Sequence, residues 1–299
     1  MTQFMGNSLS HPLSNGVFKV EEIYELRVNE DLALTIFHED EGKKLGTSVR
    51  RILISADDPR IFLIKKMQAA GKRVKGKHFF LGWNITRKYS KSELDAAVLF
   101  TLLPRSFFEP AGEECGTVYD EASACLSCGS GAKQTSPLFL PLGRIPKSKD
   151  FSLTIANEMV VSRRVVELFA DHKIRGASFE PVQGRRASGL QTDAWFQLQL
   201  NALVDVIPPT MTGTSLFELD EANEHRCVKG DLIGLNRLSE VTISAVNKGA
   251  SDIFCSRQYM GVRRGLLRPY QLIFVSPRLR KLIIEEKFKG IDFEICHVI

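Results

Sequence analysis

The strongest constraint on the fold of this 299-residue chain is a segment that occurs twice in its second half. Residues 161–182, VSRRVVELFADHKIRGASFEPV, align with residues 275–296, VSPRLRKLIIEEKFKGIDFEIC, with eight identities in 22 positions. Two copies of one pattern predict two copies of one supersecondary unit that share a layer of core. We therefore expect a duplicated helix–turn–strand unit in the second half of the chain.

Residues at the ends of each copy predict where its helix begins and ends. Ser162 and Ser276 are N-cap candidates, whose side-chain oxygens accept a free backbone N–H, and Pro277 suits the first helical position. Gly176 and Gly290 follow the helices, where a positive φ ends the turn. These signals predict a helix of about three turns in each copy.

Each copy continues into a strand that starts near Phe179 or Phe293. A short amphipathic helix that leads into a strand buries one face, so we interpret the unit as a scaffold. The alternative is that the charged residues shared by both copies form matched sites: Arg164, Arg278, Glu180 and Glu294.

Three of the six cysteines fall within fourteen positions and predict a metal site. Cys125-Leu-Ser-Cys128-Gly129 is a C-x-x-C-G knuckle, whose tight turn lets two thiolates converge on one metal ion. The segment Gly112-Glu-Glu-Cys115-Gly116 has the same frame without its first cysteine. We expect structural zinc bound by Cys115, Cys125 and Cys128.

The fourth zinc ligand stays open at this point. The candidates are Cys227, Cys255, His225, a nearby glutamate and water. The alternative to a metal site is a knuckle that has lost its metal and keeps three thiols as small packing residues. Six cysteines spread over the whole chain are too dilute for a disulfide framework.

The first half of the chain combines strand-like runs with one capped helix. A short helix and turn are expected over residues 65–77. Ser90 and Glu93 have the spacing of a capping box and predict a helix over residues 91–103. Strands are expected within three segments: residues 17–37, 50–64 and 78–85.

Composition divides the chain into three parts of an α+β fold. A hydrophobic share of 43% predicts a sizeable core. A stretch rich in Gly, Pro, Ser and Cys interrupts the regular patterns in the middle. We expect a strand-rich N-terminal part at 1–104, a knuckle and linker at 105–150, and a C-terminal part with the repeat at 151–299.

Charge is distributed unevenly along the chain. Residues 21–42 carry a net charge of −7, and residues 257–289 carry +7. Three interpretations remain open: two different partners, two segments that face each other, or ordinary solvated faces.

The sequence contains no GxGxxG, Walker A, HExxH or GxSxG motif, and we do not expect an enzyme. One alternative is an enzyme whose site is assembled from distant residues, with His225 as a candidate. A second alternative is a zinc-ribbon nucleic-acid-binding protein, in which arginines of two glycine-containing loops converge: Arg185, Arg186, Arg263 and Arg264.

The beginning of the chain, MTQFMGNSLSHPLSNG, has neither a basic nor an apolar signal region. No window reaches the roughly 18 apolar residues that a membrane span needs. We predict a cytoplasmic protein that does not associate with a membrane.

The intact knuckle, the incomplete frame at Gly112 and the ending helix–Lys-Gly-Ile-Asp-Phe-Glu resemble the bacterial double-CxxCG immunity-type proteins of polymorphic toxin systems. The resemblance covers roughly residues 105–182 and 255–299. It implies a binding protein that neutralises a cognate protein toxin in the cytoplasm by occluding its active site.

Complementary charge would speed the encounter with such a partner. The acidic segment 21–42 suits a basic, nuclease-like toxin, and the basic segment 257–289 suits an acidic one. The residues expected to contact the partner are Glu21, Glu22, Glu25, Asp40, Glu41, Arg263 and Arg264.

Overall fold

A computed structural model of the chain contains helices and strands in two compact units, Met1–Asp95 and Ala96–Ile299. This content confirms the predicted α+β class. None of the described helices is long and apolar enough to cross a membrane. The structure describes residues 20–70, 79–185, 188–213, 226–234, 236–245 and 251–299.

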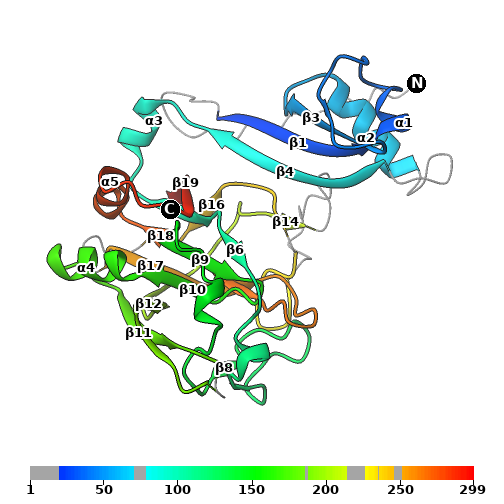
Figure 1. Cartoon of the computed structure of the whole chain (residues 1–299). Coiled ribbons are helices and arrows are strands. Elements are labelled where there is room, and N and C mark those ends of the chain that lie inside the picture. The colour runs from blue at the N-terminus through cyan, green and yellow to red at the C-terminus, as the bar shows by residue number, and fades with distance from the viewer. Residues whose placement is uncertain (1–19, 71–78, 186–187, 214–225, 235, 246–250) are drawn as a thin grey trace. The chain divides into compact units, whose positions relative to one another are not determined.

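The first unit is built on an antiparallel sheet with the strand order β2-β3-β1-β4 (Figure 1). Alternate residues of β1 and β3 are buried, among them Leu26, Val28, Ile52 and Ile54, so one face of the sheet carries the core. The bounds are β1 Glu21–Asn29, α1 Glu30–Ala33, β2 Lys43–Lys44, β3 Val49–Ser55, α2 Arg60–Ala70 and β4 Phe80–Lys88.

The strand predicted over residues 50–64 is correct only in its first half. The strand ends at Ser55, and the run RIFLI forms the start of α2. Asp58 causes the change, because its side chain accepts a hydrogen bond from the backbone N–H of Arg60 at 2.8 Å and begins a helix there. The helix part of the prediction for 65–77 is confirmed up to Ala70, and the remainder lies outside the described residues.

The capping box at Ser90 and Glu93 is formed. Glu93 accepts from the backbone N–H of Ser90 at 2.6 Å, and Ser90 Oγ accepts from the backbone N–H of Glu93 at 3.2 Å. The helix, α3, nevertheless covers only Lys91–Ala96, so the prediction of a helix over 91–103 is wrong in its second half. Residues Phe100–Pro104 form strand β5 instead.

A buried ion pair joins β3 to α1 in the first unit. Arg50, only 1% exposed, donates to both carboxylate oxygens of Glu30 at 2.6 and 2.9 Å. Its guanidinium also donates to the backbone carbonyls of Glu39 and Glu41 and so holds the loop that contains them. The hydrogen bonds from Arg50, with a smaller contribution from Lys44, lower the pKa of Glu30 from its ordinary value of 4.5 to about 2.

We expect the first unit to lose stability as the pH falls from about 4.5 to about 2. Over that range the unfolded Glu30 takes up a proton while the folded one resists it, so acid favours unfolding. The measurement is urea unfolding of the whole chain at several pH values, followed by Trp83 fluorescence in a Trp195→Phe background. Glu30→Gln should flatten this part of the pH profile, and equal profiles for both proteins would contradict the prediction.

The second unit contains two large sheets, with the orders β11-β12-β10-β9-β6 and β13-β17-β18-β5-β19-β16. The bounds in the first sheet are β6 Phe107–Phe108, β9 Phe151–Thr154, β10 Met159–Ser162, β11 Ala177–Gln183 and β12 Gln191–Leu200. The bounds in the second, besides β5, are β13 Leu203–Val204, β16 Val241–Ile243, β17 Ile253–Met260, β18 Tyr270–Val275 and β19 Ile291–Val298. Two small ribbons pair β7 Tyr119–Asp120 with β8 Lys133–Gln134, and β14 Thr212–Gly213 with β15 Asn236–Arg237.

The predicted helix–turn–strand duplication is confirmed. Helix α4, Arg163–Asp171, connects β10 to β11, and helix α5, Pro277–Glu285, connects β18 to β19. Ser276 caps its helix by accepting from the backbone N–H of Leu279 at 3.1 Å. Ser162 makes no side-chain cap hydrogen bond to α4, and its hydroxyl donates to a carboxylate oxygen of Asp150 at 2.9 Å.

The structural duplication extends well beyond the repeated sequence. The hairpin β9–β10 before α4 corresponds to the hairpin β17–β18 before α5, with Phe151 opposite Val161 and Ile253 opposite Val275. A two-residue strand runs parallel to the first strand of each hairpin, β6 beside β9 and β13 beside β17. One copy therefore runs from β5 to β11 and the other from β12 to β19.

The first strand of each copy lies in the sheet of the other copy. Strand β5 lies between β18 and β19, and β12 lies between β10 and β11. The registers match: Phe100 pairs with Val275 as Phe196 pairs with Val161. This exchange interlocks the two copies, and it explains why Phe100–Pro104 is a strand, since it is paired on both sides.

An aspartate of each copy also binds the turn that follows the helix of the other copy. Asp150 accepts from the backbone N–H of Lys289 at 2.9 Å, and Asp252 accepts from that of Arg175 at 3.2 Å. The glycine that follows each of these turn residues has positive φ, +110° in one copy and +102° in the other. The two turns are thus built alike and held reciprocally.

The repeated arginines belong to the same scaffold. Arg164 pairs with Asp150 at 3.2 Å and Arg278 with Asp252 at 3.4 Å, and each donates to a backbone carbonyl after the helix of the other copy. Helices α4 and α5 therefore lie side by side (Figure 1). The repeated glutamates differ, because Glu180 is exposed whereas Glu294 is buried and pairs with Arg237.

The exchange of strand β5 also determines where the chain divides into two units. The boundary between the units follows Asp95, whereas we expected the N-terminal part to end at residue 104. The knuckle and linker, residues 105–150, and the C-terminal part, 151–299, belong to one compact unit together with β5. A central strand of a sheet cannot be separated from the strands that it pairs with on both sides.

Candidate metal centre

Three cysteine sulfurs meet in the second unit, from Cys125, Cys128 and Cys227. All three lie within 4.8 Å of one another, and the sulfurs of Cys125 and Cys227 are 4.0 Å apart. Cys125 and Cys128 are buried, and Cys227 is half-buried. These residues lie close enough to hold a metal ion.

The first knuckle is a tight turn whose backbone faces its own sulfur. The backbone N–H of Gly129 donates to the carbonyl of Cys125 at 2.7 Å, and the N–H of Cys125 donates to the carbonyl of Ser130 at 2.7 Å. Gly129 has a φ of +75°, and a Cβ there would lie 2.6 Å from the Cβ of Arg263. Glycine is therefore required by both the turn and the neighbouring chain.

The pKa values of the two thiols in the knuckle are shifted in opposite directions. The pKa of Cys125 is lowered, first by a hydrogen bond from the Ser127 side chain and then by backbone N–H groups of Cys128 and Ser127. The pKa of Cys128 is raised, mainly because the thiol is buried. Backbone N–H groups directed at a sulfur favour the thiolate, which is the form that binds metal.

Cys227 lies in a second, similar turn. The N–H of Gly230 donates to the carbonyl of Cys227 at 2.8 Å, and the N–H of Cys227 donates to the carbonyl of Asp231 at 2.9 Å. Gly230 has a φ of +84°, and the Cys227 sulfur accepts from the backbone N–H of Lys229 at 3.3 Å. The sequence named Cys227 only as one possible fourth ligand, and the structure brings it to the centre.

Cys115, predicted as a ligand, is not part of this group of sulfurs. The frame that resembles a broken knuckle is a short 3-10 turn, in which the carbonyl of Gly112 accepts from the N–H of Cys115 at 2.8 Å. Glu158 holds this turn by accepting from the N–H of Gly112 at 3.0 Å. The Cys115 thiol is buried outside the sulfur group, where it packs as a small side chain, and burial raises its pKa.

The other candidate ligands are placed elsewhere. Cys255 and Cys296 are buried in the six-stranded sheet, where burial raises the pKa of each thiol, to about 11 and about 12. His225 lies outside the described residues.

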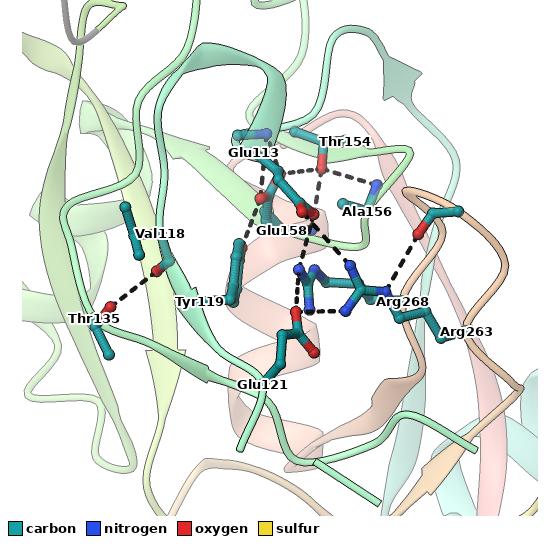
Figure 2. Close-up of polar contacts among 12 residues, drawn as sticks. Glu113, Val118, Tyr119, Glu121, Thr135, Thr154, Ala156, Glu158, Arg263 and Arg268 are labelled. Atoms are coloured by element: carbon teal, nitrogen blue, oxygen red, sulfur yellow. Dashed lines mark hydrogen bonds and ion pairs between the residues drawn. The ribbon is translucent and has the colours of Figure 1, made fainter. Parts of the chain in front are cut away.

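Arg263 and Arg268 lie near the first knuckle and are bound by carboxylates. Both contact Glu113 and Glu121, and Arg268 is 2.8 Å from each of them (Figure 2). Arg268 also lies over the ring of Tyr119, at 3.8 Å from the ring centroid. The side chain of Arg263 is therefore paired with carboxylates of the same unit.

Of the other loop arginines, Arg264 is exposed, Arg186 lies outside the described residues, and Arg185 contributes to the surroundings of Cys115. With Arg263 bound by carboxylates, the nucleic-acid alternative gains no support from the described arginines.

Most of the acidic residues predicted to contact a partner form ion pairs inside the first unit. Asp40 is exposed in the loop between α1 and β2. The pairs are Glu21 with Lys88, Glu22 with Arg87, Glu25 with Arg51 and Glu41 with Arg60. The charge of segment 21–42 is therefore matched largely by cations of the same sheet and its helices.

The sequence matches no model of a known protein family, and a search of curated proteins finds none similar to it. The sulfur cluster is the feature on which a functional proposal rests.

Proposed function

We propose that the chain is a zinc-stabilised binding protein of the immunity type, which neutralises a cognate toxin in the cytoplasm by occluding it. The observation that carries the metal part is the convergence of Cys125, Cys128 and Cys227 from two tight turns. The binding part rests on the resemblance of residues 105–182 and 255–299 to immunity-type proteins.

Zinc is the metal that best fits this donor set. Thiolate sulfur favours zinc, copper(I) and iron–sulfur clusters, and paired turns that direct backbone N–H groups at sulfur are typical of structural zinc sites. The two turns come from the two copies of the duplicated fold, so the ion would fasten one copy to the other. This position supports a structural role.

Because the metal in this proposal has a structural role, the partner is bound by the surface of the protein and not by the metal. Asp40 and Arg264 are exposed members of the two charged segments, and no described ion pair involves either of them. They are therefore suitable for testing which segment meets the partner, because their replacement should leave the fold intact.

We expect the tagged chain to capture one stoichiometric protein from a lysate of its source organism. That protein should arrest growth when expressed alone, and co-expression of this chain should restore growth. Two matched charge reversals, Asp40→Lys and Arg264→Glu, should differ in their affinity for this protein. Only the reversal in the segment that contacts the partner should weaken binding. Capture of nucleic acid alone, or of a harmless protein, would overturn the immunity proposal, while zinc content would still test the metal part.

A further inference from the structure

A carboxylate lies against two of the three sulfurs. One oxygen of Asp231, Oδ2, is 3.6 Å from the sulfur of Cys128 and 3.5 Å from that of Cys227. The other oxygen accepts from the backbone N–H of Tyr259 at 2.8 Å, and the hydroxyl of Ser130 donates to Oδ2 at 2.5 Å. These two hydrogen bonds direct the carboxylate at the sulfur cluster.

Asp231 has no positive partner among the described residues. Its side chain is almost fully buried, at 5% exposure, and no salt bridge joins it to a described Lys, Arg or His. A carboxylate buried without a cation is costly for the fold. A cation bound between the carboxylate and the sulfurs offsets that cost.

The duplication shows why a carboxylate occupies this place. Cys227 follows Cys125 by 102 positions, the same offset that separates the equivalent residues Asp252 and Asp150. In the hydrogen-bonded turns Gly230 takes the place of Gly129 and Asp231 that of Ser130, because the N–H of each glycine donates to the cysteine carbonyl and the N–H of each cysteine donates to the carbonyl of the residue after that glycine. The second turn is one residue shorter and holds no second cysteine, and its Asp231 directs an oxygen to the same cluster.

Three distances of the site match the edges of a tetrahedral ion, and the atoms that all lie within 4.8 Å of one another are the three sulfurs. With zinc–sulfur bonds of about 2.3 Å and zinc–oxygen bonds of about 2.0 Å, a tetrahedron has S···O edges of about 3.5 Å and S···S edges of about 3.8 Å. The observed S···O distances are 3.5 and 3.6 Å, and the sulfurs of Cys125 and Cys227 are 4.0 Å apart.

We infer that Asp231 is the fourth ligand of the metal centre, in a site with three thiolates and one carboxylate. The inference rests on the proposed metal site and names its missing ligand. The Ser130 hydroxyl and the Tyr259 backbone N–H orient the carboxylate, one bound to each of its oxygens, as partners of metal ligands commonly do.

The test is cobalt(II) binding to the whole chain, followed by absorption, with Asp231→Asn, Asp231→Cys and Asp193→Asn. Asp231→Asn removes the anionic ligand at nearly constant shape, so we expect cobalt(II) affinity to fall about 100-fold or more and the ligand-field bands to shift. Asp231→Cys supplies a fourth thiolate and should strengthen the sulfur-to-cobalt charge-transfer band. Asp193→Asn, the matched control, should keep the wild-type spectrum, since it neutralises an exposed carboxylate that pairs with Arg163 and lies outside the sulfur cluster.

The wild-type and variant results separate the two proposals. If the wild type binds one cobalt(II) and Asp231→Asn has the same spectrum and affinity, another group completes the site and the inference is overturned. If the wild type binds no cobalt(II) or zinc, the metal site itself is overturned. Stronger charge transfer in Asp231→Cys supports the inference even if Asp231→Asn folds poorly.

Discussion

Gly290→Ala is expected to lower the free energy of unfolding of the second unit by about 3 kcal/mol or more. Gly290 has a φ of +102°, which residues with a side chain rarely adopt. A Cβ at this position would lie 2.0 Å from the backbone oxygen of Phe151, which cannot move without breaking the turn that Asp150 binds. Urea unfolding with Trp195 fluorescence, in a Trp83→Phe background, measures the loss.

Two further glycines test the reason for this effect. Gly176 occupies the equivalent turn, with a φ of +110° and a Cβ position 1.9 Å from the oxygen of Ile253, so Gly176→Ala should be similarly costly. Gly265 has a φ of +58° and open space around its Cβ, so Gly265→Ala should cost only about 1 kcal/mol. Equal losses in Gly290→Ala and Gly265→Ala would show that the reciprocal turns do not matter for stability.

Removal of the metal is expected to lower the melting midpoint of the second unit by roughly 8–16 °C. A ligand present at about 1,000 times its Kd stabilises by about 4 kcal/mol, and each kcal/mol corresponds to about 2–4 °C for a unit of this size. Thermal unfolding with and without a strong zinc chelator, together with the zinc content of the protein, measures the effect. Cys128→Ser should bind no zinc and show no response to the chelator.

Cys115→Ser is the matched control for this experiment. Cys115 is buried like Cys128, at 5% and 1% exposure, so a serine hydroxyl is buried in both variants, but the Cys115 sulfur is outside the cluster. It should keep one zinc per chain and the full response to the chelator. If the chelator does not change the melting midpoint of the wild type, the metal centre is refuted. If Cys115→Ser loses its zinc, our assignment of the ligands is refuted.

The scaffold of the second unit could be predicted from local signals. Ser276 and Pro277 start one helix, Gly176 and Gly290 end the turns, and the structure shows both helices between the expected strands. The capping box at Ser90 was likewise readable, because it depends on residues three positions apart. Local hydrogen-bonding and backbone preferences act over a few residues and are visible in the sequence.

The length of the helix after Ser90 could not be predicted in the same way. The run that contains Phe100 is apolar and suits a helix or a strand equally well. Its partners are Val275 and Ile295, more than 170 positions away in the chain. Backbone pairing on both sides decides for the strand, and only the folded chain provides it.

In the metal centre, too, one part could be predicted from the sequence and another part could not. The C-x-x-C-G motif by itself determined that Cys125 and Cys128 share one turn, because four adjacent residues suffice to form it. Tertiary structure decided which distant residues join them, Cys227 and, by our inference, Asp231, in place of Cys115. The physical reason is that the interlocked copies bring equivalent turns face to face, whereas nearness along the chain does not set the direction of a buried side chain.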